Sequence, residues 1–278
     1  MSEETGHTND LRRLLEELVA GDIELDTAVR KLRLFQVGAV GEFARLDTYR
    51  DLRKGVPEVI YASRKSDGDL EAIVRRCLTD RGFALATRLD PARAERLRRA
   101  LGDGDGEVTR PAAGPLAGLV FSYREDARIL AAHLPAYQLP EERGCVGLLT
   151  AGTSDIPVAE EAALVIAHMG CRVERGYDTG VAGLHRLAEP LTRMLENEAD
   201  ALVVVAGMEG ALPSVVAGLV DIPVIGVPTS TGYGLGGDGT AALYSILQSC
   251  SPGLVAVNID NGVGAGAAAA LIARGRRQ

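Results

Sequence analysis

The second half of the chain alternates short apolar runs with longer amphipathic segments. The apolar runs lie at 146–149, 171–173, 202–205, 224–227 and 254–257. Helical patterns follow them at about 157–169, 182–196, 210–219, 239–249 and 263–273. Near-continuous apolar strands that alternate with helices are typical of a parallel sheet covered on both faces. We therefore predict an α/β domain over residues 141–278, built as a three-layer, doubly wound parallel sheet.

The first 140 residues show a mixed pattern with more charge. Stripes of leucine at helical spacing predict an αα-hairpin over 9–35. Further helices are predicted at 68–79, 90–101 and 125–134, and short strands at 58–61 and 116–121. The sequence therefore predicts an N-terminal helical, α+β domain over residues 1–140, with a boundary near Pro140.

Glycine, hydroxyl and carboxylate side chains gather directly after the predicted parallel strands. These segments are 150–155, 177–180, 206–210, 228–234 and 258–262. Ligands of open α/β sheets bind outside the carboxyl ends of the strands. Glycine permits close backbone approach, and N–H groups at a helix start favour phosphate. The five segments therefore predict a site for a nucleotide-sized anionic ligand.

Several residues in these segments are candidates for binding or catalysis. Ser154 and Asp155 precede a helix, where they can cap it, cradle a phosphate and ribose, or do both. His185 and Arg186 are equally compatible with a structural role and with binding of a phosphate or carboxylate. Glu209 follows an apolar strand and lies between glycines, which makes it a candidate general base.

One glycine-rich segment, 232–237, fits the G-x-G-x-x-G pattern of dinucleotide-binding loops. It follows the fourth predicted parallel strand, whereas the pattern belongs after the first. The acidic residue expected about twenty positions later is also missing. A flexible substrate loop is therefore the favoured interpretation.

The four cysteines fall into two classes. Cys77, Cys145 and Cys171 lie on helical or strand-like stretches, and we expect Cys145 and Cys171 to be small buried hydrophobes. Cys250 lies in a polar, glycine-flanked turn, where a thiolate can be partly exposed. It follows a predicted helix and precedes a strand, which in a simple crossover places it opposite the five loops. Either the segment bends back or the site is shared between subunits, and we predict a shared site.

Composition and charge exclude several functional classes. The net charge of -8 and the aromatic content of 4% argue against a nucleic-acid surface. No apolar run is long enough to span a membrane, and the polar first ten residues do not look like a signal peptide. Cysteines without paired spacing fit a reducing compartment. We therefore expect a cytoplasmic protein that binds neither nucleic acid nor membrane.

Four segments resemble the aminoimidazole ribonucleotide carboxylase (PurE-like) superfamily, whose fold is flavodoxin-like. They are A-G-T-S-D at 151–155, G-M-E-G-A-L-P-S at 207–214, P-V-I-G-V-P at 223–228 and S-I-L-Q-S-C at 245–250. Three others are similar to its LarB branch, namely 53–61, 177–186 and 257–262. The resemblance extends over roughly residues 45 to 275. One departure is A-S-R-K-S at 62–66, where the family has a glycine-containing G-K-T loop.

The resemblance implies a reaction. LarB enzymes carboxylate the pyridinium ring of nicotinic acid adenine dinucleotide and cleave its phosphoanhydride, which gives pyridinium-3,5-biscarboxylic acid mononucleotide and AMP. This is the first step of nickel-pincer nucleotide cofactor synthesis, so other enzymes of that pathway become partners. The co-substrate is CO2 or bicarbonate, and no tightly bound cofactor is expected. The superfamily forms octamers, so a homo-octamer or another homo-oligomer is expected here.

The resemblance also implies roles for individual residues. Cys250 becomes the nucleophile, and Glu209 takes the proton from the ring carbon that is carboxylated. The expected substrate-binding residues are Thr153, Ser154, Asp155, Asp178, His185, Arg186, Gly207, Met208, Ser230 and Lys65. Cleavage of the phosphoanhydride needs charge neutralisation, by arginine or by Mg2+ near Asp155, Asp178 or Asp260.

Two other functions remain open. One is an aminoimidazole ribonucleotide carboxylase or mutase of purine biosynthesis. The other is a nucleotide-binding regulatory protein without chemistry. Product analysis distinguishes the first from the LarB reaction, and ligand binding without turnover or a thiol adduct would support the second.

Overall fold

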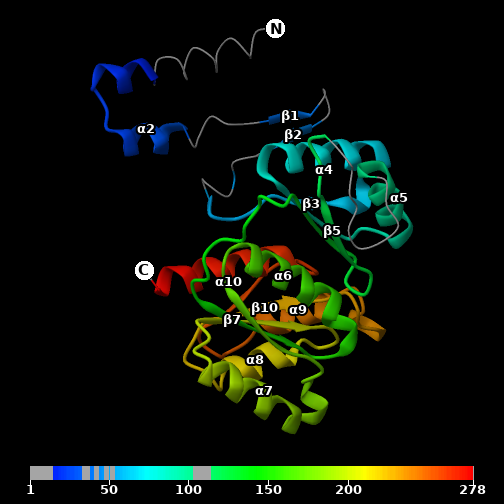
Figure 1. The fold of residues 1–278 in the computed structure, drawn as a ribbon. Helices are drawn as coiled ribbons and strands as arrows, with labels where there is room; N and C mark the ends of the chain where they lie inside the picture. Colours follow the sequence, from blue (N-terminus) through cyan, green and yellow to red (C-terminus); the bar gives the residue numbers. More distant parts are fainter. Residues whose placement is uncertain are drawn as a thin grey trace.

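A computed structural model describes residues 15–32, 38–40, 44–46, 50, 54–102 and 114–277. Helical residues 15–20 precede α2 (Leu25–Leu32), and a short antiparallel ribbon pairs β1 (Gly38–Val40) with β2 (Ala44–Leu46). The beginning of the predicted αα-hairpin lies outside the described residues. Two larger sheets follow, one above the other in Figure 1.

The C-terminal sheet has five strands, all parallel, in the order β11-β10-β9-β7-β8. The strands are β7 (Cys145–Thr150), β8 (Arg172–Gly176), β9 (Ala201–Ala206), β10 (Val224–Pro228) and β11 (Leu254–Ala256). The helices are α6 (Ile156–His168), α7 (His185–Glu196), α8 (Ala211–Ala217), α9 (Thr240–Leu247) and α10 (Gly262–Arg276). The predicted doubly wound α/β fold is confirmed.

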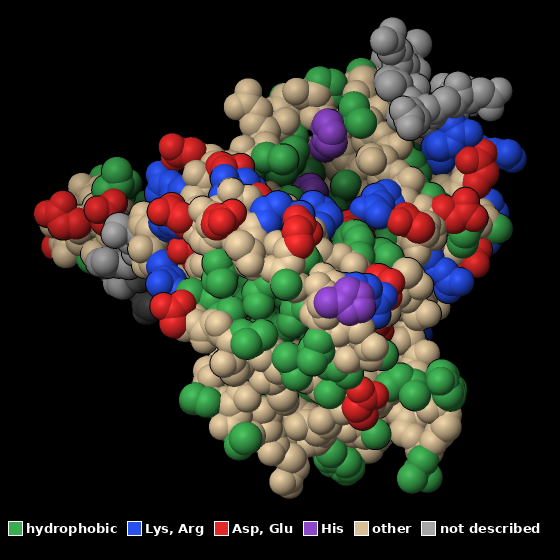
Figure 2. Space-filling model, turned by 90° about the horizontal axis from the view of Figure 1, so that it is seen from below, with side chains coloured by type: hydrophobic (Ala, Val, Ile, Leu, Met, Phe, Trp, Pro, Cys, Tyr) green, Lys and Arg blue, Asp and Glu red, His purple; other side chains and the backbone are tan. Residues whose placement is uncertain are grey.

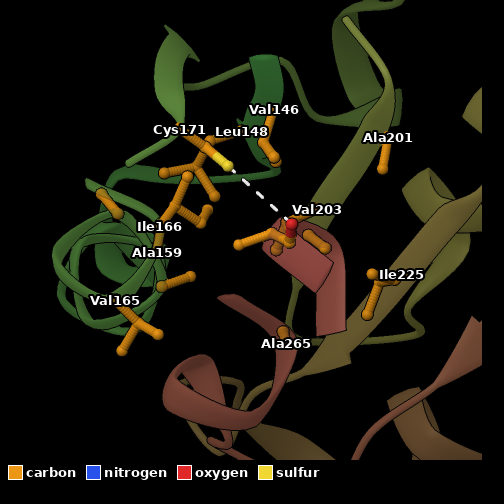
Figure 3. Packing of buried hydrophobic residues seen from close by; sticks show 14 of the residues in the cluster. Val146, Leu148, Ala159, Val165, Ile166, Cys171, Ala201, Val203, Ile225 and Ala265 are labelled. Carbon is orange, nitrogen blue, oxygen red and sulfur yellow. Dashed lines mark hydrogen bonds between the residues drawn. The ribbon is translucent and has the colours of Figure 1, made fainter. Parts of the chain in front are cut away.

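Helices cover both faces of this sheet. On one face α6 and α10 bury residues such as Ile166 and Ala265 in one cluster with Val203 of β9 (Figure 3). On the other, α7 and α8 bury residues such as Met194 and Val216. Because each central strand is buried on both faces, its sequence is continuously apolar rather than alternating.

Helix α10 approaches α6 unusually closely. A Cβ atom added to Gly266 would lie 2.5 Å from the carbonyl oxygen of Ala162, and one added to Gly262 would lie 2.1 Å from that of Val158. Side chains are therefore excluded at both positions. The two glycines therefore follow from this contact and not from helix propensity, which glycine lowers.

The N-terminal sheet is mixed and has the order β3-β4-β6-β5. Its strands are β3 (Val59–Tyr61), β4 (Phe83–Thr87), β5 (Val120–Arg124) and β6 (Ile129–His133). β3 and β4 are parallel, whereas β6 runs antiparallel to both β4 and β5. α4 (Asp67–Arg81) and α5 (Pro91–Leu101) cover one face. The other face meets Leu164 of α6 through Phe83, Leu85 and Ile129.

The helix predicted at 125–134 is wrong, because this segment forms a turn followed by β6. Ile129, Leu130 and Ala132 are buried on a strand that has neighbours on both sides. A short apolar run of this kind does not distinguish a strand from a helix by periodicity. β4, whose five residues are all buried, was missed for the same reason.

Candidate functional site

A cavity of about 340 Å³ opens at the carboxyl edge of the C-terminal sheet. The strand order places β7 between β8 and β9. The chain therefore leads to one side of β7 to form β8 and to the other side to form β9, which makes this position the switch point of the sheet. Residues that follow β7, β8, β9 and β10 line the cavity. They include Ser154, Asp155, Gly180, Arg186, Gly207, Met208, Glu209, Thr231, Gly232 and Tyr233. The cavity therefore lies where ligands of such sheets bind.

Asp155 holds the turns after β7 and β10 together. One carboxylate oxygen accepts from the N–H of Gly152 at 2.9 Å. The other accepts from the hydroxyls of Thr229 at 2.7 Å and Thr231 at 2.8 Å. Asp155 is buried, and these three donors compensate the cost of burying its charge. Its first role is therefore to position the loops, while its neighbour Ser154 lines the cavity.

Arg186 supplies the positive charge of the cavity. Its guanidinium lies 2.5 Å from a carboxylate oxygen of Asp178 and remains partly exposed. Asp178 adopts a positive φ of 56°, and its N–H donates to the hydroxyl of Thr150. Arg186 comes from the first turn of α7, so a fixed loop and a helix end orient it together. Such a guanidinium can bind a phosphate or a carboxylate in bidentate fashion.

Glu209 lies in a tight turn between β9 and α8. Met208 and Gly210 both have positive φ, and the N–H of Gly210 donates to the carbonyl of Gly207 at 2.9 Å. A Cβ at Gly210 would lie 2.7 Å from the backbone of Ala242, so this glycine is required. The turn presents an exposed Glu209 at the cavity, and its carboxylate has no hydrogen-bond partner among the described residues. It is therefore available to accept a proton from a ligand.

Not all predicted residues reach the cavity. Ser154, Asp155, Arg186, Gly207, Met208 and Glu209 line it, whereas Thr153, Asp178, His185, Ser230, Lys65 and Cys250 do not. Asp178 contributes through Arg186, and Ser230 bonds to Asp260 through its N–H and its hydroxyl. Lys65 follows β3 of the N-terminal sheet, and its carbonyl accepts from Arg93.

The residues expected near Mg2+ do not form a ligand set. Asp155 accepts from backbone and threonine donors, Asp178 from Arg186, and Asp260 from Ser230. Within the described ranges, no group of three or more His, Cys, Asp or Glu side chains could hold a metal ion. A cation held by the protein alone does not fit these residues.

Cys250 lies at the opposite edge of the sheet from the cavity. β11 is parallel to β10, and the N–H of Val224, which begins β10, donates to the carbonyl of Gly253. The residues directly before β11 therefore lie at the amino edge. Cys250 is exposed there, whereas Cys77, Cys145 and Cys171 are buried. The segment does not bend back toward the cavity of its own chain.

Several functional candidates were missed in the sequence. Three threonines fix the loops around the cavity through hydrogen bonds to Asp155 and Asp178, namely Thr150, Thr229 and Thr231. The only sequence signal for this role is that they lie in segments rich in hydroxyl groups. Glu160 and Glu161 are adjacent buried carboxylates in α6, and their position near the start of a predicted helix indicates only a favourable interaction with the helix dipole. No sequence signal distinguishes a helix residue that faces water from one covered by another part of the chain.

Comparisons with known proteins agree with this geometry. Residues 145–278 match the AIR carboxylase family model, and residues 38–134 match the model of the LarB/PurE-like N-terminal domain. An uncharacterized protein of Methanocaldococcus jannaschii is 42% identical over 95% of this chain and 97% of its own length. The chain is a LarB-like member of the PurE superfamily.

More distant relatives match less than half of this LarB-like protein. The N5-carboxyaminoimidazole ribonucleotide mutase of Thermotoga maritima is 34% identical over 46% of this chain and 73% of its own length. The N5-carboxyaminoimidazole ribonucleotide mutase of M. jannaschii is 33% identical over 41% of this chain and 69% of its own length. The superfamily contains carboxylases and mutases, so the LarB-like chain belongs to an enzyme family of that type. In the described part of the chain no helix is long and apolar enough to cross a membrane.

Proposed function

We propose that this LarB-like protein carboxylates the pyridinium ring of nicotinic acid adenine dinucleotide and cleaves its phosphoanhydride. The products are pyridinium-3,5-biscarboxylic acid mononucleotide and AMP, and the first of them passes to later enzymes of nickel-pincer nucleotide cofactor synthesis. The observation that carries the proposal is the exposed thiol of Cys250 in a chain whose other three cysteines are buried.

The electronic character of the substrate explains the need for a thiol. An aminoimidazole is electron-rich and can attack CO2 directly, whereas a pyridinium is electron-poor and cannot. Addition of the Cys250 thiolate to ring carbon 4 forms a C–S bond and a neutral dihydropyridine. Its carbon 5 is enamine-like and forms a C–C bond with CO2. Loss of the carbon-5 proton and breaking of the C–S bond restore the aromatic cation and the thiolate.

Glu209 and Arg186 supply the remaining functions. Glu209 lacks a hydrogen-bond partner among the described residues and lines the cavity, so it can take the carbon-5 proton. Arg186 can neutralise the phosphate or the ring carboxylate. In the hydrolytic step water forms a bond to phosphorus, and the phosphoanhydride P–O bond breaks to release AMP. Arginine can stabilise the charge that develops on the leaving phosphate.

Because Cys250 and Glu209 lie at opposite edges of one sheet, we propose that two copies of the chain share the site. The elements that flank Cys250 expose apolar side chains, which are Leu219, Tyr244, Leu247 and Val255. The first of these is 60% exposed, Tyr244 and Leu247 are 63% exposed, and Val255 is 56% exposed. Figure 2 shows hydrophobic side chains and few charges over the lower part of the visible face. Exposed patches of this kind mark association surfaces. A homo-oligomer, in this superfamily an octamer, would cover them.

A second candidate is carboxylation or rearrangement of an aminoimidazole ribonucleotide. It is favoured by the relatives named as N5-carboxyaminoimidazole ribonucleotide mutases. These proteins match less than half of this chain, whereas residues 38–134 match the model of a LarB/PurE-like N-terminal domain. That reaction also leaves Cys250 without a chemical role.

Product analysis tests the proposal. The protein is incubated with bicarbonate and either nicotinic acid adenine dinucleotide or an aminoimidazole ribonucleotide, and the products are weighed by mass spectrometry. We expect a dicarboxylated pyridinium mononucleotide and AMP from the dinucleotide, and no new product from the aminoimidazole. Cys250→Ser should lower carboxylation at least about 100-fold, as expected for loss of a covalent nucleophile. Turnover of the aminoimidazole alone would contradict the proposal.

A further inference from the structure

A second cavity, of about 390 Å³, lies between the N-terminal and C-terminal sheets. It is lined by Tyr61 and Val59 of β3, Thr87 and Arg88 at the end of β4, Glu161 of α6, residues 258–261 after β11, and Val263 of α10. Its volume falls in the range of about 300–1,000 Å³ that is typical of small-molecule sites. None of its lining residues has a role in the chemistry described above.

Arg88 is the central group of the second cavity. Its guanidinium donates to a carboxylate oxygen of Glu161 at 3.2 Å and to the carbonyl of Asp260 at 2.5 Å. It also lies over the ring of Tyr61, 5.3 Å from the centroid. A guanidinium has five N–H donors, so these two bonds leave capacity for an anionic ligand. Its side chain is one-third exposed and can be reached from the cavity.

Glu161 and Tyr61 provide two further kinds of contact. The Glu161 side chain is only 6% exposed, and its second oxygen has no hydrogen-bond partner among the described residues. It can therefore accept from a ligand hydroxyl or amino group. Tyr61 is 44% exposed and offers an aromatic face for stacking. An aromatic face, a carboxylate and a guanidinium around one cavity match the base, the hydroxyls and the phosphate of a nucleotide.

The two cavities share a wall. Asp260 lines the second cavity, and its carboxylate binds the N–H of Ser230 at 2.8 Å and the hydroxyl of Ser230 at 2.6 Å. Thr231 and Gly232, the next residues, line the first cavity. Ser230, which is hydrogen-bonded to Asp260 and precedes Thr231 in the chain, therefore connects the walls of the two cavities. A ligand with two nucleotide halves can occupy both.

We propose that the second cavity holds the adenylate half of the dinucleotide, while the first holds the pyridinium mononucleotide half. The inference rests on the proposed function, because that function supplies a dinucleotide substrate. In this arrangement the adenine stacks on Tyr61, and Glu161 and Arg88 bind the ribose and the phosphate. The N-terminal sheet then acts as the adenylate-binding part of the enzyme.

Binding of each half of the substrate tests the inference. AMP and nicotinic acid mononucleotide are titrated separately into the full-length protein by calorimetry. Tyr61→Ala should weaken AMP binding about 5- to 150-fold, the effect of losing one base–aromatic stack of about 1–3 kcal/mol. Tyr61→Phe keeps the ring and should bind AMP as the unmodified protein does. Asn258→Asp, which keeps the side-chain oxygen that accepts from Ile259 but adds a negative charge, should also weaken AMP binding.

Neither Tyr61→Ala nor Asn258→Asp should alter the affinity for nicotinic acid mononucleotide, whereas Arg186→Ala should lower it. Unchanged AMP affinity in both Tyr61→Ala and Asn258→Asp, or mutual exclusion of AMP and the mononucleotide, would overturn the inference. If the dinucleotide is converted and neither Tyr61→Ala nor Asn258→Asp alters the affinity for AMP, this inference fails and the proposed function stands. If AMP binds as expected and the dinucleotide is not converted, the proposed function fails alone.

Discussion

The two neighbouring glutamates at the start of α6 show how the surroundings of a carboxylate decide its protonation. Burial raises the pKa of Glu161 from its ordinary 4.5 to about 7, because the single hydrogen-bonded Arg88 compensates it only in part. Burial also acts to raise the pKa of Glu160. There Arg175, Tyr177 and Arg124 surround the carboxylate and hold the pKa below its ordinary value. The number of donors therefore outweighs burial at Glu160 but not at Glu161.

These opposite shifts predict opposite effects of pH on stability. The folded protein holds the Glu161 proton more tightly than the unfolded chain does. The contribution of Glu161 to the free energy of unfolding is therefore complete below pH 4.5 and is lost as pH rises through 7. The difference between the folded and unfolded pKa of Glu161 corresponds to about 3 kcal/mol of stability. Denaturant unfolding of wild type and Glu161→Gln between pH 4.5 and 8 should show the wild-type advantage falling by about that amount.

Glu160→Gln is the matched control. Because its folded pKa is lowered, the contribution of Glu160 is present above the ordinary pKa and is lost as pH falls. The difference between wild type and Glu160→Gln should therefore shrink toward acid pH. A wild-type advantage over Glu161→Gln that stays constant across the pH range would show that Glu161 titrates normally.

At the scale of elements, sequence patterns predicted the C-terminal region well and the N-terminal sheet poorly. The parallel strands from β7 to β11 are separated by helices, so the switch in periodicity marks each boundary. β4 and β6 are short, buried and close to helices, so their apolar residues carry no distinguishing period. The antiparallel addition of β6 beside β4 depends on pairing of distant segments, which local pattern does not encode.

The sequence predicts the part of the candidate site that lies within the C-terminal sheet, but not the part that depends on packing between the two sheets. The loops after the strands had to meet at one edge once the sheet was parallel, so Ser154, Arg186 and Glu209 could be placed together. The second cavity could not be foreseen. It requires β3 and β4 of one sheet to end beside the loop that follows β11 of the other. Only the packing of the two sheets brings Arg88 to Glu161, 73 residues away in the chain.

At the scale of the whole molecule, the separation of Cys250 from Glu209 predicts complementation between chains. Glu209→Gln and Cys250→Ser should each be inactive alone. Co-expressed as mixed oligomers, they should form intact sites from Glu209 of one chain and Cys250 of another. Random mixing of equal amounts would restore roughly a quarter of the sites in a symmetric assembly.

The activity of the co-expressed chains, purified through two different tags, measures this directly. Mixing a Glu209→Gln, Cys250→Ser double variant with either single variant is the control and should restore nothing. Mixed oligomers as inactive as the separate variants would indicate that each chain completes its own site.

The central claim is that Cys250 forms a covalent bond to the pyridinium ring. The most direct measurement is the intact mass of the full-length protein after exposure to nicotinic acid adenine dinucleotide, or to NAD as a slow analogue, followed by rapid acid quenching. Wild type and a Cys77→Ala control, which removes a buried thiol, should both gain the mass of one nucleotide adduct per chain. Cys250→Ser should gain none. An adduct that persists in Cys250→Ser, or carboxylated product formed by that variant at the wild-type rate, would contradict the account.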